Sequence, residues 1–252
     1  MSEVFAVALQ GMQADMTRVR QVGMNLANAL TTGYKGSVVV QTPVGTSFAG
    51  HLTGAAATAP TLEDAAADNA VSIRHDMRTG TLKSTGQALD VAITGRGFLE
   101  VITPDGPAYT RQGNLRLDAQ GRLVTAQGYP VQGTAGDIVL TTSSPVIDGA
   151  GLLLGPSGEE DAPLAELKLV EFEPGTEPRA LGEGLFAAGA AMKTLAREDR
   201  QVRQGALENS NVSSIDEMTQ LIHSMRHFEA LHKMAQAYDE MLGTAIRKLG
   251  ES

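Results

Sequence analysis

Residues 88–133 read ALDVAITGRGFLEVITPDGPAYTRQGNLRLDAQGRLVTAQGYPVQG. Short runs of alternating apolar and polar residues follow one another here, and pairs that contain glycine separate them. Asp105-Gly106 lies between FLEVI and AYTR, and Gln120-Gly121 lies between NLRL and RLVTA. Alternation on both sides of such a pair is typical of a β-hairpin. The middle of the chain therefore predicts a β-rich domain.

The two ends of the chain have a helical periodicity instead. Apolar residues recur at steps of three and four from Phe5 to Leu30, and again from Leu221 to Leu249. This spacing predicts one long helix at each end, each with a narrow apolar stripe. The expected fold class is α+β, in which the long N- and C-terminal helices form a coiled-coil-like helical domain and a β-rich middle domain is inserted between them.

These patterns also predict the domain boundaries. Residues 1–35 and 205–252 are expected to form a discontinuous terminal helical assembly domain, and residues 78–204 the β-rich middle domain. Residues 36–77 are expected to be a linker or extended segment, because residues 49–70 contain few large apolar side chains.

Composition excludes several classes of function. The chain has 252 residues, a net charge of −9 and no cysteine. The negative charge argues against a nucleic-acid partner, and the lack of cysteine excludes disulfides and thiolate metal sites. The N-terminal residues lack the basic and apolar segments of a cleaved signal peptide, and no apolar run is as long as a membrane span. We therefore expect no membrane insertion.

The sequence offers no positive support for an enzyme. His223 and His227 have the i, i+4 spacing of a two-histidine metal site, but Ser-Met-Arg lies between them and no third ligand is near in sequence. GRGFLE, residues 95–100, lacks the third glycine of a nucleotide-binding loop and reads as a β-turn. We therefore predict no catalytic, cofactor-binding or metal-binding residues, and no cofactor.

A second stretch, NLANALTTGYKG at residues 25–36, carries two amides at the end of the first helix. Asn25 and Asn28 are three residues apart and so share a helix face. Asparagine is a poor helix former, so we expect these amides to meet partners in an assembly. Gly33 can adopt a positive φ and end the helix.

Four blocks in this order resemble the bacterial flagellar rod and hook family. NLANALTTGYKG resembles the N-terminal signature of that family, and ALDVAITGRGFLEV, residues 88–101, resembles its central stretch. YTRQGNLRLDAQGRLVTAQGYPVQG, residues 109–133, is similar to the hairpin pattern that follows. The C-terminal signature is matched by QGALENSNVSSIDEMTQLIHSMRHFEALHKMAQAYDEML, residues 204–242.

Within the family, the flagellar basal-body rod proteins of the proximal-rod type fit best. The total length agrees, and MRHFEALHK, residues 225–233, is similar to a stretch of that type. The distal-rod type is the close alternative, but its extra aromatic-rich segment is missing after Tyr34-Lys35. The resemblance implies a non-enzymatic structural subunit that polymerises through its terminal helices to form the torque-transmitting shaft.

The resemblance also implies partners and a location. The partners would be other flagellar rod proteins, copies of this chain and the flagellar export apparatus. The chain would reach the periplasmic rod of the basal body by type III export, without a cleaved signal peptide. The expected assembly interface consists of Phe5, Leu9, Met12, Met16, Val19, Asn25, Asn28, Gly33, Tyr34, Lys35, Asn211, Val212, Leu221, Met225, Phe228, Leu242 and Ile246.

Three other readings remain open. A distal-rod or hook-type axial protein of the same family would share all four blocks. A secreted β-rich enzyme would need a deep pocket with convergent carboxylates in the middle domain. A coiled-coil-tethered binding module would form closed oligomers of fixed number rather than open filaments.

Overall fold

A computed structural model describes residues 2–41, 71–155, 163–173, 175–176, 178–188 and 191–250. Most of the expected linker over residues 36–77 lies outside the described residues. The chain divides into two compact units. We call them the helical unit, Met1–Leu26, Ser37–Arg74 and Ser214–Ser252, and the β unit, Ala27–Gly36 and His75–Ser213.

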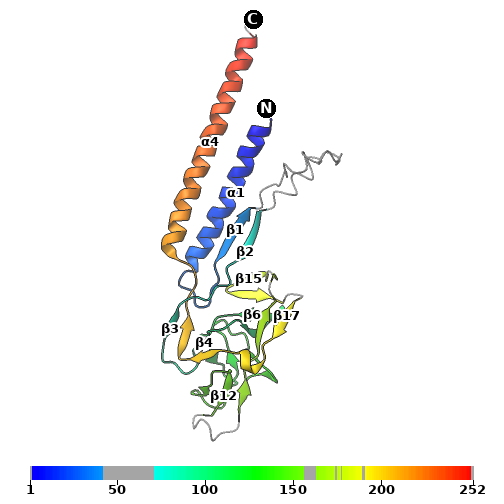
Figure 1. The fold of residues 1–252 in the computed structure, drawn as a ribbon, viewed down its shortest axis with the longest axis vertical. Helices are drawn as coiled ribbons and strands as arrows, with labels where there is room; N and C mark the ends of the chain where they lie inside the picture. Colours follow the sequence, from blue (N-terminus) through cyan, green and yellow to red (C-terminus); the bar gives the residue numbers. More distant parts are fainter. Residues whose placement is uncertain are drawn as a thin grey trace. The chain divides into compact units, whose positions relative to one another are not determined.

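The helical unit is built on two long helices, α1 (Ser2–Ala27) and α4 (Ser214–Gly250), which lie side by side in Figure 1. They run antiparallel. Asn25, late in α1, bonds Glu217, early in α4, and a Cβ on Gly11 would lie 2.8 Å from a methyl of Leu231. The strands β1 (Ser37–Gln41) and β2 (Val71–His75) form a two-stranded sheet in the same unit. Neither helix of the described residues is long and apolar enough to cross a membrane.

The prediction of a coiled-coil-like helical domain is wrong, although the α+β class agrees with the structure. The described residues contain two long helices, and several apolar residues expected in their seam are exposed instead: Leu9 is 47% exposed and Met16 58% exposed. The faces that are buried carry small and polar side chains instead. They are Ala8, Ala14, Asp15, Gln21, Val22 and Asn25 of α1 and Glu217 and Ser224 of α4.

The reason for this error is physical. Steps of three and four define a stripe on a helix but not the direction in which the stripe faces. On α1 the small and polar residues Ala8, Gly11 and Asp15 follow the same steps as the apolar ones, one position away. Small side chains let two helices approach closely, and the polar side chains find hydrogen-bond partners there. The apolar stripe is therefore left on the flank.

The described residues of the β unit form short strands and one 3-10 turn. They are β3 (Leu82–Ser84), β4 (Val91–Ile93), β5 (Phe98–Thr103), β6 (Gly106–Thr110), β7 (Arg116–Leu117), β8 (Leu123–Val124), β9 (Gln132–Gly133), β10 (Gly136–Asp137), β11 (Val146–Ile147), β12 (Leu152–Leu154), β13 (Ala165–Glu166), β14 (Leu169–Phe172), β15 (Ala180–Gly182), β16 (Leu185–Ala187), β17 (Met192–Thr194), η1 (Arg197–Asp199), β18 (Val202–Gln204) and β19 (Ala206–Glu208).

A six-stranded antiparallel sheet of order β15-β16-β6-β5-β14-β17 organises this unit. Its residues alternate between two faces, as the period of a strand requires. On β5, Leu99 enters the larger, mainly aliphatic cluster, whereas Phe98 enters a second cluster with Tyr109 and Phe186. Phe98 meets Phe172 edge to face, with ring centroids 5.0 Å apart. The central strands of the sheet are therefore packed on both faces.

The two hairpins predicted from the sequence are confirmed. β5 and β6 pair in register from Leu99–Thr110 to Thr103–Gly106, and Gly106 has φ 121°. β7 and β8 pair through Leu117 and Leu123. The smaller sheets are β18-β4, β19-β3, β10-β9 and β11-β12-β13.

Gly113 generates a testable prediction about the β unit. A Cβ at this position would lie 1.6 Å from the carbonyl oxygen of Val91, and that residue's N–H donates to the Gly113 oxygen at 2.9 Å. Because the neighbour is backbone, Gly113→Ala should destabilise the β unit by about 2 kcal/mol or more in denaturant unfolding. Gly149→Ala is the control, since nothing lies within 4 Å of its Cβ position. Equal stability of the two variants would contradict this packing.

Candidate assembly interface

Three of the sequence motifs meet at one buried carboxylate, that of Glu208. Lys35 Nζ donates to Glu208 Oε1 at 2.6 Å, and Arg111 Nη1 donates to Oε2 at 3.0 Å. Both side chains of the lysine–glutamate pair are fully buried, and that of Arg111 is 4% exposed. We call these three residues the Glu208 cluster. It joins the N-terminal signature, the central hairpin and the C-terminal signature inside the β unit.

Backbone groups complete the Glu208 cluster. The Gly80 N–H donates to Glu208 Oε1 at 2.9 Å, and Lys35 also donates to the Arg78 carbonyl at 2.7 Å. Burial lowers the pKa of Lys35 from its ordinary 10.5, and the hydrogen bond to Glu208 partly offsets that effect. A buried charge is tolerated only when it is paired and hydrogen-bonded, and this cluster meets that condition.

Arg111 has further contacts of its own. Its guanidinium donates to the Ile93 and Gly95 carbonyls at 3.3 and 2.8 Å, and it lies 5.1 Å from the centroid of the Phe98 ring. Its Nε has no hydrogen-bond partner among the described residues.

Gly33 has the positive φ that the sequence suggested, 67°. Helix α1 has already ended at Ala27, however, so Gly33 turns the chain after the helix rather than capping it. A Cβ there would lie 2.4 Å from the backbone of Arg111, and the Gly33 N–H donates to the Glu208 carbonyl at 2.8 Å. Close backbone approach, and not only the turn, therefore requires glycine.

In the helical unit, the Asn25 amide is used within its own chain. It donates to the Ser37 carbonyl at 2.8 Å and to Glu217 Oε1 at 2.9 Å, and it accepts from the Ser37 N–H at 3.0 Å. Gln21 contacts the hydroxyl of Ser37. The amide thus ties α1 to β1 and to α4. Asn28, in the β unit, accepts from the hydroxyl of Thr31.

Glu217 is the member of this network whose hydrogen bonding is incomplete among the described residues. It is 9% exposed, and its Oε2 is buried without a hydrogen-bond partner among the described residues. Burial raises the pKa of Glu217 above its ordinary 4.5, the Asn25 hydrogen bond lowers it, and the charge of Asp216 raises it further. His227 Nδ1 lies 2.5 Å from Asp15 Oδ2, which is a second polar contact between the two helices.

The remaining residues of the expected interface differ in exposure. Leu9, Met16 and Met225 are exposed, whereas Met12, Val19, Leu221, Phe228, Tyr34 and Val212 are half-buried. Asn211 is half-buried and bonds neighbouring backbone. The side chains of Phe5, Leu242 and Ile246 lie outside the described residues. The structure brings together the motif residues Gly33, Lys35 and Asn211, and leaves much of the apolar stripe on the surface.

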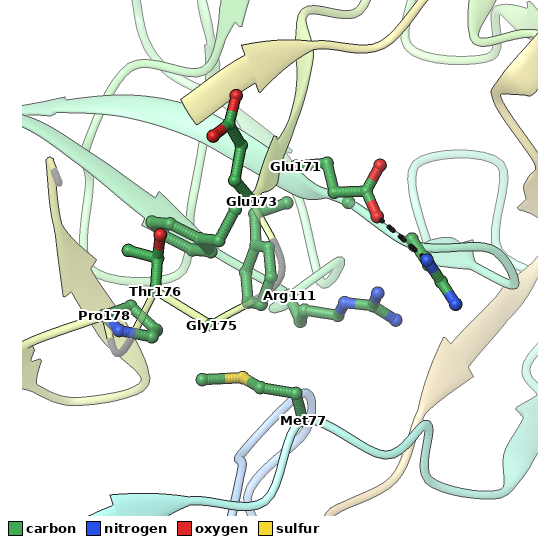
Figure 2. Close-up of a pocket in the computed structure, with 11 residues that line it drawn as sticks. Met77, Arg111, Glu171, Glu173, Gly175, Thr176 and Pro178 are labelled. Carbon is green, nitrogen blue, oxygen red and sulfur yellow. Dashed lines mark ion pairs between the residues drawn. The ribbon is translucent and has the colours of Figure 1, made fainter. Parts of the chain in front are cut away.

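A cavity of about 360 Å³ lies on the aromatic face of the β unit, and Figure 2 shows the residues that line it. Phe98, Phe172 and Met77 line it together with Arg111. Its carboxylates do not converge: Glu171 pairs with Arg96 at 3.6 Å, and the carboxylate of Glu173 points away from Arg111 in Figure 2. The site that a glycosidase-like or hydrolytic mechanism needs is not formed by the residues described here.

Sequence reasoning missed Glu208, Arg111, Ser37 and Glu217 as parts of these networks. Each is a single polar residue in a motif, and its partner lies far away along the chain. No local signal marks the Glu208 cluster, because the flanking residues differ: Lys35 stands between Tyr34 and Gly36, Arg111 between Thr110 and Gln112, and Glu208 between Leu207 and Asn209.

Comparisons with known proteins agree with these motifs. A family model described as flagellar basal body rod FlgEFG protein C-terminal matches residues 203–248, and one described as flagellar hook protein FlgE/F/G D1 domain matches residues 92–154. The chain is similar to the flagellar basal-body rod protein FlgG of Bacillus subtilis, with 30% identity over 93% of this chain and 94% of that protein. It is similar to FlgF of Salmonella typhimurium, with 34% identity over 90% of each chain. FlgF of Rhizobium meliloti is 32% identical over 98% of this chain and 97% of its own.

The Glu208 cluster predicts an order of stabilities. Glu208→Gln leaves two buried cations without their carboxylate and should cost about 3–5 kcal/mol of unfolding free energy. Lys35→Met keeps the pair between Glu208 and Arg111 and should cost less, about 1–3 kcal/mol. Denaturant unfolding of the two variants checks the order, and a larger loss for Lys35→Met would contradict it.

Glu217 predicts a pH dependence of the helical unit. Because burial raises its folded-state pKa, the stability that Glu217 contributes is complete below its unfolded pKa of 4.5 and is lost as pH rises through the folded-state pKa. Thermal unfolding of the helices, followed by circular dichroism from acidic to neutral pH, should show this loss. Glu217→Gln should abolish it, and Glu229→Gln, at an exposed position of α4, should not. Identical pH profiles for all three proteins would contradict the assignment.

Proposed function

The chain belongs to the family of flagellar basal-body rod proteins, and from this premise we propose that it polymerises with other rod proteins and with copies of itself through the exposed apolar flanks of its terminal helices. It is a structural subunit of the flagellar basal-body rod and not an enzyme. We also propose that the chain, as a rod subunit, helps to transmit torque along the rod.

The observation that carries the proposal is the exposure of large apolar side chains on both helices. Single exposed apolar residues are ordinary on a protein surface, but a row of them along one helix marks an interaction surface. The first turns of α4 carry such a row at steps of three and four: Ile215 is 78% exposed, and Met218, Ile222 and Met225 are 50–52% exposed. On α1 the corresponding residues are Leu9, Met16 and Met24.

The way in which the two helices meet supports the same proposal. The buried residues of the two helices are mostly small or polar, so the contact within one chain leaves large apolar side chains on both helices exposed. Methionine side chains adapt to irregular partner surfaces, which suits a subunit that must meet several different neighbours. The exposed and half-buried residues of the interface expected from the sequence enter the proposal, as do those whose side chains lie outside the described residues. The buried residues Asn25, Gly33 and Lys35 support the fold of the subunit that presents this surface.

Three finer points belong to the proposal. We propose that the chain is a proximal-rod, FlgF-type subunit. The identity of 34% to FlgF of Salmonella typhimurium, against 30% to FlgG of Bacillus subtilis, supports this proposal. We also propose that the chain is delivered by the flagellar export apparatus without a cleaved signal peptide. Its site of action would then be the periplasmic part of the basal body.

The apolar row on α4 makes a prediction that separates assembly from folding. Ile222→Lys combined with Met225→Lys should change the unfolding free energy of the isolated chain by only about 0.5 kcal/mol per site, because both side chains are exposed. The variant should nevertheless fail to enter isolated basal bodies, since each buried lysine would lack a partner. Gln220→Lys, also exposed on α4, is the control. Normal incorporation of the double variant, measured by immunoblot, would contradict the proposed surface.

A further inference from the structure

The chain passes between the two units at four places: between residues 26 and 27, 36 and 37, 74 and 75, and 213 and 214. Any force that travels along the covalent chain from one unit to the other passes through these peptide connections. The residues that adjoin them on the β-unit side are therefore the ones that receive such a force. The inference drawn from them concerns the β unit alone and rests on the proposed function.

The side chain of Asn211, which lies near the crossing between residues 213 and 214, binds backbone groups next to two of the other crossings. Its Oδ1 accepts from the Gly36 N–H at 2.8 Å, and its Nδ2 donates to the Asp76 carbonyl at 2.7 Å and to the Arg78 carbonyl at 3.1 Å. Gly36 is the last β-unit residue before one crossing, and Asp76 follows another by two residues. Asn211 itself is the third residue before a third crossing. One amide therefore ties three of the four crossings together.

Backbone hydrogen bonds close the same small network. The Asp76 N–H donates to the Gly36 carbonyl at 2.7 Å, and the Asn211 N–H donates to the Tyr34 carbonyl at 3.4 Å. Glu208 lies three residues before Asn211, at the end of β19, and its carboxylate binds Lys35 and the Gly80 N–H. The segments 33–36, 76–80 and 208–211 are thus anchored to the buried interior of the β unit.

We propose that Asn211 is a positioning residue that holds these three segments as one joint, and that this joint limits how far the subunit yields when the rod is under torque. Asparagine suits the position because its amide offers both an acceptor, used by Gly36, and donors, used by Asp76 and Arg78. Without the amide, each connection can move separately, since each loses a hydrogen bond that held it to the others. The folded β unit keeps its two packed clusters in either case.

Asn209 provides a matched control two residues away. Its amide donates to the hydroxyl of Thr81 at 2.9 Å in an exposed contact and binds none of the residues next to a crossing in the contacts described above. Asn209→Ala and Asn211→Ala remove the same atoms from the same loop. Asn211→Asp is a second variant, because it keeps the acceptor for Gly36 but has no N–H for the Asp76 and Arg78 carbonyls.

The first test is hydrogen exchange on the purified chain, followed by mass spectrometry of peptides that cover residues 33–36 and 76–80. Asn211→Ala should speed exchange there by about tenfold or more, as expected when local opening loses one hydrogen bond. Asn209→Ala should exchange as the unmodified chain does. Equal rates in both variants would overturn the proposal. If Asn211→Ala does not fold, Asn211→Asp takes its place in this test and the next.

The second test is rotation of tethered cells from a strain that lacks its own copy of the gene. Asn211→Ala should build rods and turn normally at low load, but lose speed at high load, where Asn209→Ala keeps it. The proposal is overturned if cells with Asn211→Ala rotate at the normal speed at every load. It is also overturned if the variant folds but builds no rods. Absence of the unmodified chain from isolated basal bodies would instead contradict the proposed function, so the two failures are distinguishable.

Discussion

The β unit depends on the burial of one carboxylate, that of Glu208. A carboxylate without solvent needs opposite charge and hydrogen-bond donors on every side, and here Lys35, Arg111 and the Gly80 N–H supply them. These partners come from distant parts of the chain, so the site is complete only when the N-terminal segment, the central hairpin and the C-terminal strand have all been brought together. Such a cluster adds little net stability compared with an apolar core of the same volume. Its value, by hypothesis, is that a wrong pairing of the segments would leave an unpaired buried charge.

In the helical unit, hydrogen bonds between polar side chains hold the two helices together. Asn25 ties α1 to Ser37 and Glu217, and Asp15 meets His227, so the two helices are fixed by directional contacts. Apolar side chains are non-directional and are worth most where they leave water. By holding the helices together with polar groups and small residues, the subunit keeps its apolar side chains free for neighbours in the rod.

The sequence predicted those features that depend on neighbours along the chain. The hairpin at Asp105-Gly106, the positive φ of Gly33 and the presence of a long helix at each end follow from turn chemistry and periodicity. The direction in which the apolar stripe of α1 faces does not follow, because periodicity is the same whichever stripe is buried. The Glu208 cluster does not follow either, since Glu208 and Lys35 are separated by most of the chain and nothing local marks them as partners.

Contacts between residues that are distant in the sequence also explain the positions of the family signatures. Gly33, Lys35 and Arg111 stand in motifs that resemble those of other rod proteins, yet in this structure they contact one another and Glu208 rather than the solvent. A motif in an assembling protein is readily interpreted as part of a contact surface. For this reason Lys35 was expected in the assembly interface. Because the Lys35 side chain is fully buried against Glu208, its role is to stabilise the fold of the subunit. The exposed partners of assembly are instead the apolar flanks, such as Ile215 and Met225, where many different hydrophobic residues would serve and no strict motif is required.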